Sequence, residues 1–255
     1  MPVLRFAPLS VLVVSLVGQL PAQTPAVPDC AELATALRAV FANDVRLRDW
    51  PNLNRYREAN RTEVDPQVVF IGDSITDVWQ QPRFGGFFPG KRYADRGISG
   101  QTTPQMLLRF RADVVKLKPK AVVILAGTND IAGNTGPMTN DEIQDNLASM
   151  SELAAANGIK VVLASILPVS EYHRATPTAT PQTSLRPMHR IRAINEWMRK
   201  YAEARKHTYL DYFSAMTDDK GLLKEEFSAD DLHPTAAGYA VMAPLAEAAL
   251  ARVLR

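Results

Sequence analysis

From residue 68 onward, short apolar runs alternate with longer segments in which apolar residues recur every three or four positions. The apolar runs, which predict β-strands, are 68–71, 121–126, 160–165 and 208–211, with a weaker one at 92–97. The segments that predict helices are 76–81, 103–116, 140–157, 186–206 and 235–254. A return to a parallel strand requires a crossover, which is usually a helix. The pattern therefore predicts a three-layer α/β/α domain on a five-stranded parallel sheet.

The first apolar run ends at Gly72 and leads through Asp73-Ser74 into a predicted helix. Four successive apolar residues are typical of a strand buried on both faces. At such a strand-turn-helix junction, a serine hydroxyl lies beside free helix N–H groups that could hold an oxyanion. Ser74 is therefore a candidate nucleophile. Taken alone, however, Asp and Ser at a helix start are more typical of capping than of catalysis.

A secretory signal peptide is predicted over residues 1–22. Arg5 supplies the positive charge, residues 6–16 form an apolar stretch, and Pro21-Ala22 is a suitable small-residue exit. The apolar stretch is too short for a comfortable membrane span, so we expect no stable membrane anchor. The sequence thus predicts a secreted or periplasmic protein.

Residues 23–65 are predicted to form a linker and a helical extension, before a main domain at 66–255. Helical periodicity extends over 31–49, a second short helix is expected at 53–61, and both are expected to pack on the main domain. We find no candidate chemistry in this segment. A lipid anchor on Cys30 is an alternative to a plain free thiol, but the preceding residues lack the small-residue run of such sites.

Composition narrows the class of protein further. With 255 residues, of which 46% are hydrophobic, the chain can bury a full core, and one main domain is the simplest expectation. The formal net charge is +2, and the Lys and Arg residues are scattered along the chain, so we expect no nucleic-acid partner. The single cysteine cannot form an intramolecular disulfide.

Polar clusters follow several predicted strands on the edge where ligands of open parallel sheets bind. Residues 97–100 follow the second strand, 127–130 follow the third, and Asp230 and His233 precede the last helix. A serine needs a base to become nucleophilic, and a histidine serves when a carboxylate orients it. The spacing of Asp230 and His233 allows that pairing. A capping Asp and a surface histidine would produce the same local pattern.

An acyl-transfer site also needs hydrogen-bond donors for the negative oxygen of the tetrahedral intermediate. Candidates are the backbone N–H groups of Ser74 and Gly100 and the side-chain amide of Asn129. Glycine at position 100 would let the backbone approach a substrate closely, although a tight turn also favours glycine. Asn129 could likewise be a turn residue that bonds its own backbone.

Two groups of residues near the predicted edge are open to two interpretations. Tyr172 and His173, in the loop after the fourth strand, could line an acyl or leaving-group pocket, or could be solvated loop residues. The aromatic residues at 79–88 could form a rim that shields the acyl group, but core packing explains them better.

Four short blocks resemble those of the SGNH, or GDSL-type, hydrolases. They are Gly-Asp-Ser at 72–74, Gly-Ile-Ser-Gly at 97–100, Gly-Thr-Asn-Asp at 127–130 and Asp-x-x-His at 230–233. All four occur in the order of that family, and the resemblance covers residues 68–254. One block alone would be weak evidence, whereas four in order make coincidence improbable.

The resemblance implies a site and a fold. Ser74 would be the nucleophile, Asp230 and His233 the rest of a catalytic triad, and Gly100 and Asn129 would complete the oxyanion hole with the Ser74 amide. The implied sheet is flavodoxin-like, and the implied reaction is carboxylic ester hydrolysis without a metal or other cofactor.

Within this family, the runs at 92–103 and 127–133 look closest to the branch of platelet-activating-factor acetylhydrolase subunits and secreted bacterial acyl-esterases. That branch implies a short acyl group such as acetyl, on a carbohydrate or small alcohol. Its members often carry Asp where this chain has Gln101, which leaves open the contact made by that carboxylate. Asp73 is expected to be structural and to bond neighbouring loop backbone.

Other functions stay open at this point. Lysophospholipids and thioesters could be handled by the same triad. A metal-dependent phosphoesterase would find oxygen and nitrogen ligands in Asp73, Asn129, Asp130, Asp230 and His233, but few histidines for a second metal. An inactive glycan-binding module would have no need of the predicted triad residues together.

Overall fold

The structure, a computed structural model, describes residues 29–43, 45–62, 65–176 and 178–255. The predicted signal peptide lies outside these residues. By its contacts the chain forms two units, 1–43 and 44–255. The first contains α1 (Cys30–Asn43), whose first residue is a free thiol. That α1 packs on the main domain stays a prediction.

The extension departs from the sequence prediction in its second half. The helix expected at 53–61 is wrong over most of its length, since turns precede a short helix, α3 (Ala59–Thr62). The Asp49 carboxylate accepts hydrogen bonds from the backbone N–H groups of Leu53 (2.8 Å) and Asn54 (2.9 Å). This local capping competes with the helical hydrogen bonds and holds the chain in turns.

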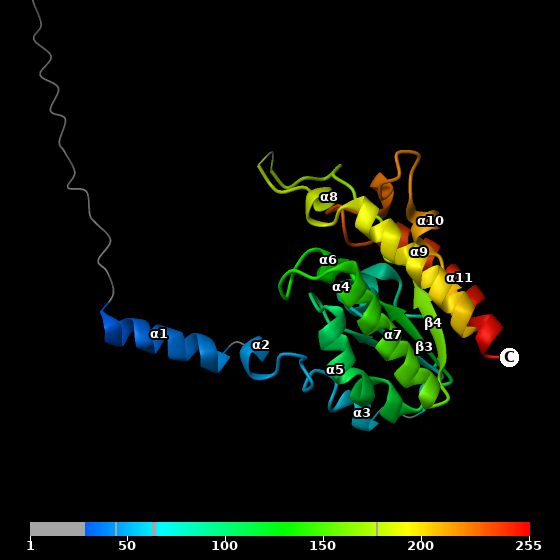
Figure 1. The fold of residues 1–255 in the computed structure, drawn as a ribbon, viewed down its shortest axis with the longest axis horizontal. Coiled ribbons are helices and arrows are strands. Elements are labelled where there is room, and N and C mark those ends of the chain that lie inside the picture. Colours follow the sequence, from blue (N-terminus) through cyan, green and yellow to red (C-terminus); the bar gives the residue numbers. More distant parts are fainter. Residues whose placement is uncertain (1–28, 44, 63–64, 177) are drawn as a thin grey trace, which may run out of the picture. The chain divides into compact units, whose positions relative to one another are not determined.

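Five parallel strands form the sheet of the second unit (Figure 1). They are β1 (Val68–Gly72), β2 (Tyr93–Gly97), β3 (Ala121–Leu125), β4 (Lys160–Ala164) and β5 (Thr208–Leu210). Their order across the sheet is β2-β1-β3-β4-β5, and all four pairings are parallel. The predicted five-stranded α/β fold is confirmed. The strand order changes direction beside β1, which places the end of β1 where ligands of such sheets bind.

Helices connect and cover the strands (Figure 1). The sheet unit contains α2 (Val45–Arg48), α4 (Ser74–Asp77), α5 (Thr103–Asp113), α6 (Thr128–Ile131), α7 (Asn140–Ala156), α8 (Gln182–Leu185), α9 (Met188–Arg205), α10 (Tyr212–Met216) and α11 (Ala236–Val253). The predicted helices at 103–116, 140–157, 186–206 and 235–254 are confirmed in type, with small shifts of their ends. Among the helices of the described residues, none combines the length and apolar character needed to cross a membrane.

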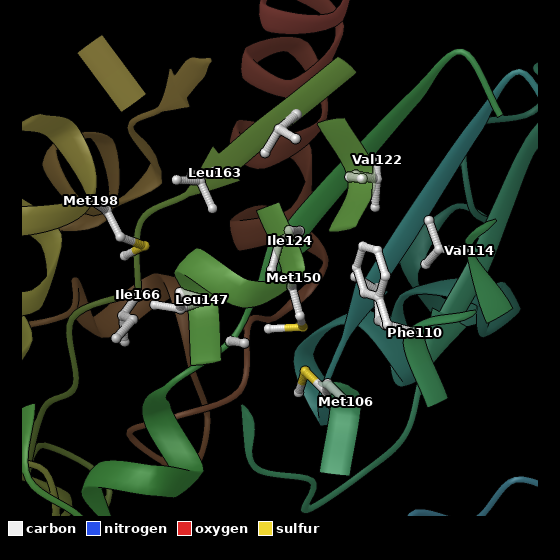
Figure 2. Close-up of a cluster of buried hydrophobic side chains, with 14 of the residues drawn as sticks. Met106, Phe110, Val114, Val122, Ile124, Leu147, Met150, Leu163, Ile166 and Met198 are labelled. Carbon is white, nitrogen blue, oxygen red and sulfur yellow. The ribbon is translucent and has the colours of Figure 1, made fainter. Parts of the chain in front are cut away.

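Both faces of the sheet are buried, which explains why the strands are continuously apolar. Val69 and Ile71 of β1 belong to a cluster with residues of α5, α7 and α9. Val68 and Phe70, their neighbours, belong to a second cluster with residues of α11. Figure 2 shows part of the first cluster, in which Phe110 of α5 lies among the strand and helix side chains. Alternate residues of one strand thus face opposite helix layers.

The aromatic residues after the first block are mostly core residues. Trp79 is 3% exposed and Phe88 is 7% exposed. Both contact the Phe70 ring, with centroid distances of 6.4 Å and 5.1 Å, respectively. The Trp79 ring also lies 4.7 Å from the ring of Tyr239 in α11. This packing ties the segment after the first block to the last helix, as the core interpretation expected.

A buried carboxyl group lies beside the end of β2. Asp95 is 8% exposed, and its Oδ1 accepts a hydrogen bond from the Gly97 N–H at 2.7 Å. Its other oxygen has no hydrogen-bond partner among the described residues. Burial raises the pKa of Asp95 to about 7, although the Gly97 hydrogen bond acts in the opposite direction.

This raised pKa predicts how Asp95→Asn changes stability with pH. The pKa of Asp95 is higher in the folded state than its ordinary value of 3.8, so the wild-type fold loses stability as pH rises from about 4 to about 7. Asn cannot ionise and escapes this loss. We expect the stability of Asp95→Asn relative to wild type to increase over that range, by roughly 1.4 kcal/mol per pH unit at most. Urea unfolding at several pH values measures it.

Asp145→Asn, at an exposed position of α7, is the matched control for Asp95→Asn. Its stability relative to wild type should change little over the same pH range. Parallel pH dependences of wild type and Asp95→Asn would show that the Asp95 carboxyl group titrates alike in both states.

Candidate active site

Ser74 lies at the tip of the junction between β1 and α4. It is the first residue of α4, and Asp73 caps that helix by accepting a hydrogen bond from the Ile75 N–H at 2.9 Å. Asp73 therefore has the structural contact expected of it. Its side chain is buried, and burial raises the pKa of Asp73 to about 6.

Three residues predicted from separate blocks meet at this point. The Ser74 Oγ lies 2.8 Å from the Nε2 of His233, although 159 positions separate them in the chain. The other ring nitrogen of His233, Nδ1, lies 2.6 Å from the Oδ2 of Asp230. This hydroxyl–imidazole–carboxylate chain has the connectivity of a serine-hydrolase triad.

The Asp230 carboxylate is held by its own loop. Its Oδ1 accepts hydrogen bonds from the backbone N–H groups of His233 at 2.7 Å and Leu232 at 3.1 Å. Partial burial would raise the pKa of Asp230, but the hydrogen bonds from the His233 side chain and these backbone groups outweigh it. The pKa of Asp230 is consequently well below its usual range, so the group facing the imidazole is a carboxylate.

Asp231 fastens this loop to the rest of the domain, a role that the sequence did not indicate. Its Oδ1 accepts a hydrogen bond from the Ser170 hydroxyl at 2.7 Å, and its backbone carbonyl accepts one from the Ser170 N–H at 3.0 Å. Asp231 has a φ of 68°, an uncommon value for a residue other than glycine. Its partner lies 61 positions away, so no local pattern of residues indicates this contact.

Tyr172 and His173 do not line the cavity at Ser74. The His173 N–H donates to the Asp231 carboxylate at 2.9 Å, so this residue also supports the Asp230–His233 loop. The Tyr172 hydroxyl donates to Asp218 at 2.7 Å, and Tyr172 lines a separate cavity. The structure therefore places neither residue in the lining of the cleft that contains Ser74.

The candidate oxyanion donors lie on the same cleft as Ser74. Asn129 is 3% exposed, and its Nδ2 donates one hydrogen bond to the Gln101 carbonyl at 3.0 Å. Its Oδ1 faces the Arg186 Nη2 at 3.4 Å, and the Arg186 Nε donates to Thr128 at 3.1 Å. These contacts fix the orientation of the Asn129 amide, because its nitrogen faces the Gln101 carbonyl and its oxygen faces Arg186. Arg186 gave no sequence signal, because it appeared only as the start of a predicted helix.

Glycine is favoured at positions 97 and 100 for two different structural reasons. A Cβ at Gly97 would lie 2.1 Å from the backbone nitrogen of Asp77, so glycine lets α4 pack against the end of β2. Gly100 has a φ of 80°, a left-handed value that favours glycine. The nearest atom to a Cβ at Gly100 would be the Asn134 Nδ2 at 4.0 Å. Glycine there keeps the backbone uncovered on the cleft side.

An open cleft of about 490 Å³ contains the candidate residues. Its lining residues are Ser74, Val78, Arg83, Phe84, Ser99, Gly100, Asn129, Asn134, Arg186, Asp230, Leu232 and His233. A ligand in this cleft can reach the Ser74 hydroxyl and the Asn129 amide together. Among the residues that the structure describes, no group of three or more His, Cys, Asp or Glu side chains is placed to hold a metal ion.

Gln101 connects three parts of the molecule. Its Nε2 donates to the Pro51 carbonyl at 2.8 Å, and its Oε1 accepts from the Arg109 Nε at 2.6 Å. Its own carbonyl accepts from Asn129. A neutral amide can donate and accept at once, which a carboxylate cannot do. The segment around Pro51, which precedes β1, is thereby attached to the loop that carries Gly100.

Arg109 in α5 is fully buried beneath this loop. Besides Gln101, it donates to the carbonyls of Arg96 at 2.8 Å and Gly72 at 3.0 Å, at the ends of β2 and β1. It also pairs with Asp113, one helical turn away, at 3.0 Å. One guanidinium thus holds the ends of two strands and the second-block loop in one arrangement.

The fold and the hydroxyl–imidazole–carboxylate chain define a hydrolase of the α/β/α type with a serine-centred site. The sequence profile of the GDSL-like lipase/acylhydrolase family matches residues 70–241. The chain belongs to this family, and the protein is a carboxylic ester hydrolase of the SGNH, or GDSL, type.

Individual relatives agree with this assignment. The structure of a GDSL-like lipase from Bacteroides thetaiotaomicron is 38% identical, covers 80% of this chain and 99% of its own, and superposes with a TM-score of 0.71. Human platelet-activating factor acetylhydrolase IB subunit alpha1 is 25% identical over 80% of this chain and 84% of its own. Esterase TesA of Pseudomonas aeruginosa is 36% identical over 39% of this chain and 53% of its own. The chain spans about half of TesA's length.

The buried contacts of Arg109 predict a large loss of stability in Arg109→Met. Methionine fills part of the space but leaves Asp113 buried without its cation and two strand carbonyls without a donor. Removing one partner of a buried pair typically costs about 3–5 kcal/mol. We expect a loss of this size in the free energy of unfolding, measured by urea denaturation.

The neighbouring Leu108→Ala, at a position 57% exposed, is the control for Arg109→Met. It should change the free energy of unfolding by no more than about 0.5 kcal/mol. If Arg109→Met were as stable as this control, the hydrogen bonds of the buried guanidinium would not hold the strand ends.

Proposed function

We propose that this protein is a secreted esterase that removes short acyl groups, acetyl above all, from a carbohydrate or small alcohol through an acyl-enzyme. The observation that carries the proposal is the continuous chain from the Ser74 hydroxyl to His233 (2.8 Å) and on to Asp230 (2.6 Å). Export of the protein is supported by the signal-peptide pattern in residues 1–22.

In the acylation step, the Ser74 Oγ attacks the ester carbonyl carbon. His233 Nε2, in hydrogen-bond contact with that oxygen, takes its proton as the new C–O bond forms. Asp230 accepts the Nδ1–H of the same ring and stabilises the imidazolium that results. The low pKa of Asp230 fits this task, since the group must stay charged while the imidazole cycles.

The tetrahedral intermediate carries a negative oxygen that the cleft must stabilise. We assign this task to the backbone N–H groups of Ser74 and Gly100 and to the Asn129 side-chain amide. The Ser74 N–H belongs to the first turn of α4, where helix N–H groups lack partners within the helix. Arg186, held beside Asn129, orients that amide and adds positive charge to the cleft.

Collapse of the intermediate breaks the ester bond to the alcohol. His233 returns its proton to the leaving alkoxide, which departs as the neutral alcohol. Water then attacks the acyl-Ser74 ester with His233 again as the base, and the second intermediate releases the acid and restores the Ser74 hydroxyl. Each proton taken is returned, so the enzyme ends the cycle unchanged.

A short acyl group is supported by the cleft and by the relatives. The apolar side chains on the cleft lining are Val78, Phe84 and Leu232, which can cover a small acyl group. One relative is named for the hydrolysis of an acetyl ester, the human platelet-activating factor acetylhydrolase subunit. We therefore place acetyl first among the acyl groups.

The role of Ser74 predicts that Ser74→Ala loses activity toward nitrophenyl esters by roughly 10⁴-fold or more, because no other nucleophile replaces the hydroxyl. The wild type should prefer acetate over butyrate and octanoate esters in kcat/KM. Ser149→Ala, which removes an exposed serine of α7, is the control and should keep wild-type rates.

Two results would contradict the proposal in different ways. Retained activity in Ser74→Ala would remove the proposed nucleophile. A preference for octanoate, or for lysophospholipid or acyl-thioester substrates, would keep the triad but replace the short-acyl substrate class.

The oxyanion assignment predicts that Asn129→Ala lowers kcat for nitrophenyl acetate by about 10²–10³-fold, because the amide acts mainly on the charged intermediate. KM should change much less, since the ground-state carbonyl carries little charge. Asn54→Ala, at an exposed position of the extension, is the matched control. A rise in KM with unchanged kcat would instead make Asn129 a ground-state binding residue.

A further inference from the structure

A second cavity, of about 570 Å³, adjoins the catalytic cleft. The two cavities share three lining residues, Ser99, Gly100 and Asn134. Gly100 is also a proposed oxyanion donor. The second cavity therefore begins within the active site and extends away from Ser74, toward the segment that precedes β1.

Trp50, from that segment, lines the cavity. Trp50 is 41% exposed, so a ligand can cover part of its indole surface. Its backbone is fixed, because the Trp50 carbonyl accepts a hydrogen bond from the Gln105 Nε2 at 2.7 Å. The next carbonyl, of Pro51, accepts from Gln101 at 2.8 Å. The backbone that carries the indole is thus held beside the loop of Gly100.

The polar groups of the cavity are uncharged. Asn52, Ser99, Asn134 and Thr135 contribute amides and hydroxyls, and no Asp, Glu, Lys, Arg or His is among the described residues of its lining. An ionic ligand would find no opposite charge there. The apolar side chains of the lining are Leu47, Trp50 and Ile98, so an acyl chain would meet the polar groups as well. A neutral ligand with hydroxyl groups and one apolar face matches the lining, because hydroxyls pair with amides and the apolar face covers the indole.

We infer that this cavity is a carbohydrate subsite, in which a neutral sugar ring lies against Trp50 while a neighbouring ring presents its acetyl ester to Ser74. The inference rests on the proposed esterase function and deepens it by naming the alcohol part of the substrate. It also assigns a function to the segment before β1, in which the sequence showed no chemistry.

The first experiment compares two substrates on each variant. It measures kcat/KM for acetylated neutral xylo-oligosaccharides and for nitrophenyl acetate, and takes their ratio, which is independent of the fraction of active enzyme. We expect Trp50→Ala to lower this ratio about tenfold, mainly through the KM of the oligosaccharide, as expected for the loss of one stacked aromatic contact. Trp50→Phe should restore most of it.

Two further variants support the comparison. Asn52→Gly removes an amide from the cavity, and glycine suits the backbone there because Asn52 has a φ of 54°. It should lower the ratio by roughly threefold, the loss of one hydrogen bond. Leu108→Ala, an exposed change on α5 outside the cavity lining, should leave the ratio unchanged. An unchanged ratio in Trp50→Ala would overturn the subsite.

The second experiment separates binding from catalysis. Ser74→Ala is titrated with the same acetylated xylo-oligosaccharides, and tryptophan fluorescence is recorded. A saturable change that is lost in Ser74→Ala/Trp50→Phe supports the subsite. If wild type hydrolyses nitrophenyl acetate but Ser74→Ala shows no saturable binding, the subsite is wrong and the esterase stands. If wild type hydrolyses no ester while the Trp50-dependent fluorescence change persists, the esterase function is wrong and the subsite stands.

Discussion

The buried guanidinium of Arg109 is the interaction on which the arrangement of the site most depends. It donates hydrogen bonds to the carbonyls of Gly72 and Arg96, at the ends of adjacent strands, and to the Gln101 side chain, and it pairs with Asp113. A charged group without water must satisfy most of its donors, so these acceptors are held at defined positions. The junction before Ser74 and the loop with Gly100 are built on the same fixed group.

The other half of the site is fastened by separate contacts. The hydroxyl of Tyr239 in α11 donates to the Ile75 carbonyl at 2.7 Å, which ties the last helix to the helix that Ser74 begins. Asp231 binds Ser170 after β4 and so holds the loop of His233 from the other side. Two anchors on different elements restrict the imidazole to a position in which its Nε2 meets the Ser74 oxygen, which is the preorganisation that acyl transfer requires.

Much of the site could be read from local patterns, and the remainder could not. Ser74, Asp230 and His233 lie in short motifs that are ambiguous one at a time and indicate a catalytic site only when all four blocks are taken together in order. Arg186 has no such motif, because its contact with Asn129 joins residues 57 positions apart. The turns after Asp49 differ from the helix that the local pattern predicts. One carboxylate caps two backbone N–H groups there and overrides the helical pattern.

Hydrophobic periodicity and the four blocks are local properties of the chain, so the alternation of strands and helices, the sheet class and the family could be predicted from residues alone. Tertiary structure decided which groups touch. The contact between Ser74 and His233, the bridge from Pro51 through Gln101 to Arg109, and the cavity beside Trp50 all join residues distant in sequence. Such contacts follow from how the layers pack, and no local pattern of residues encodes the resulting distances.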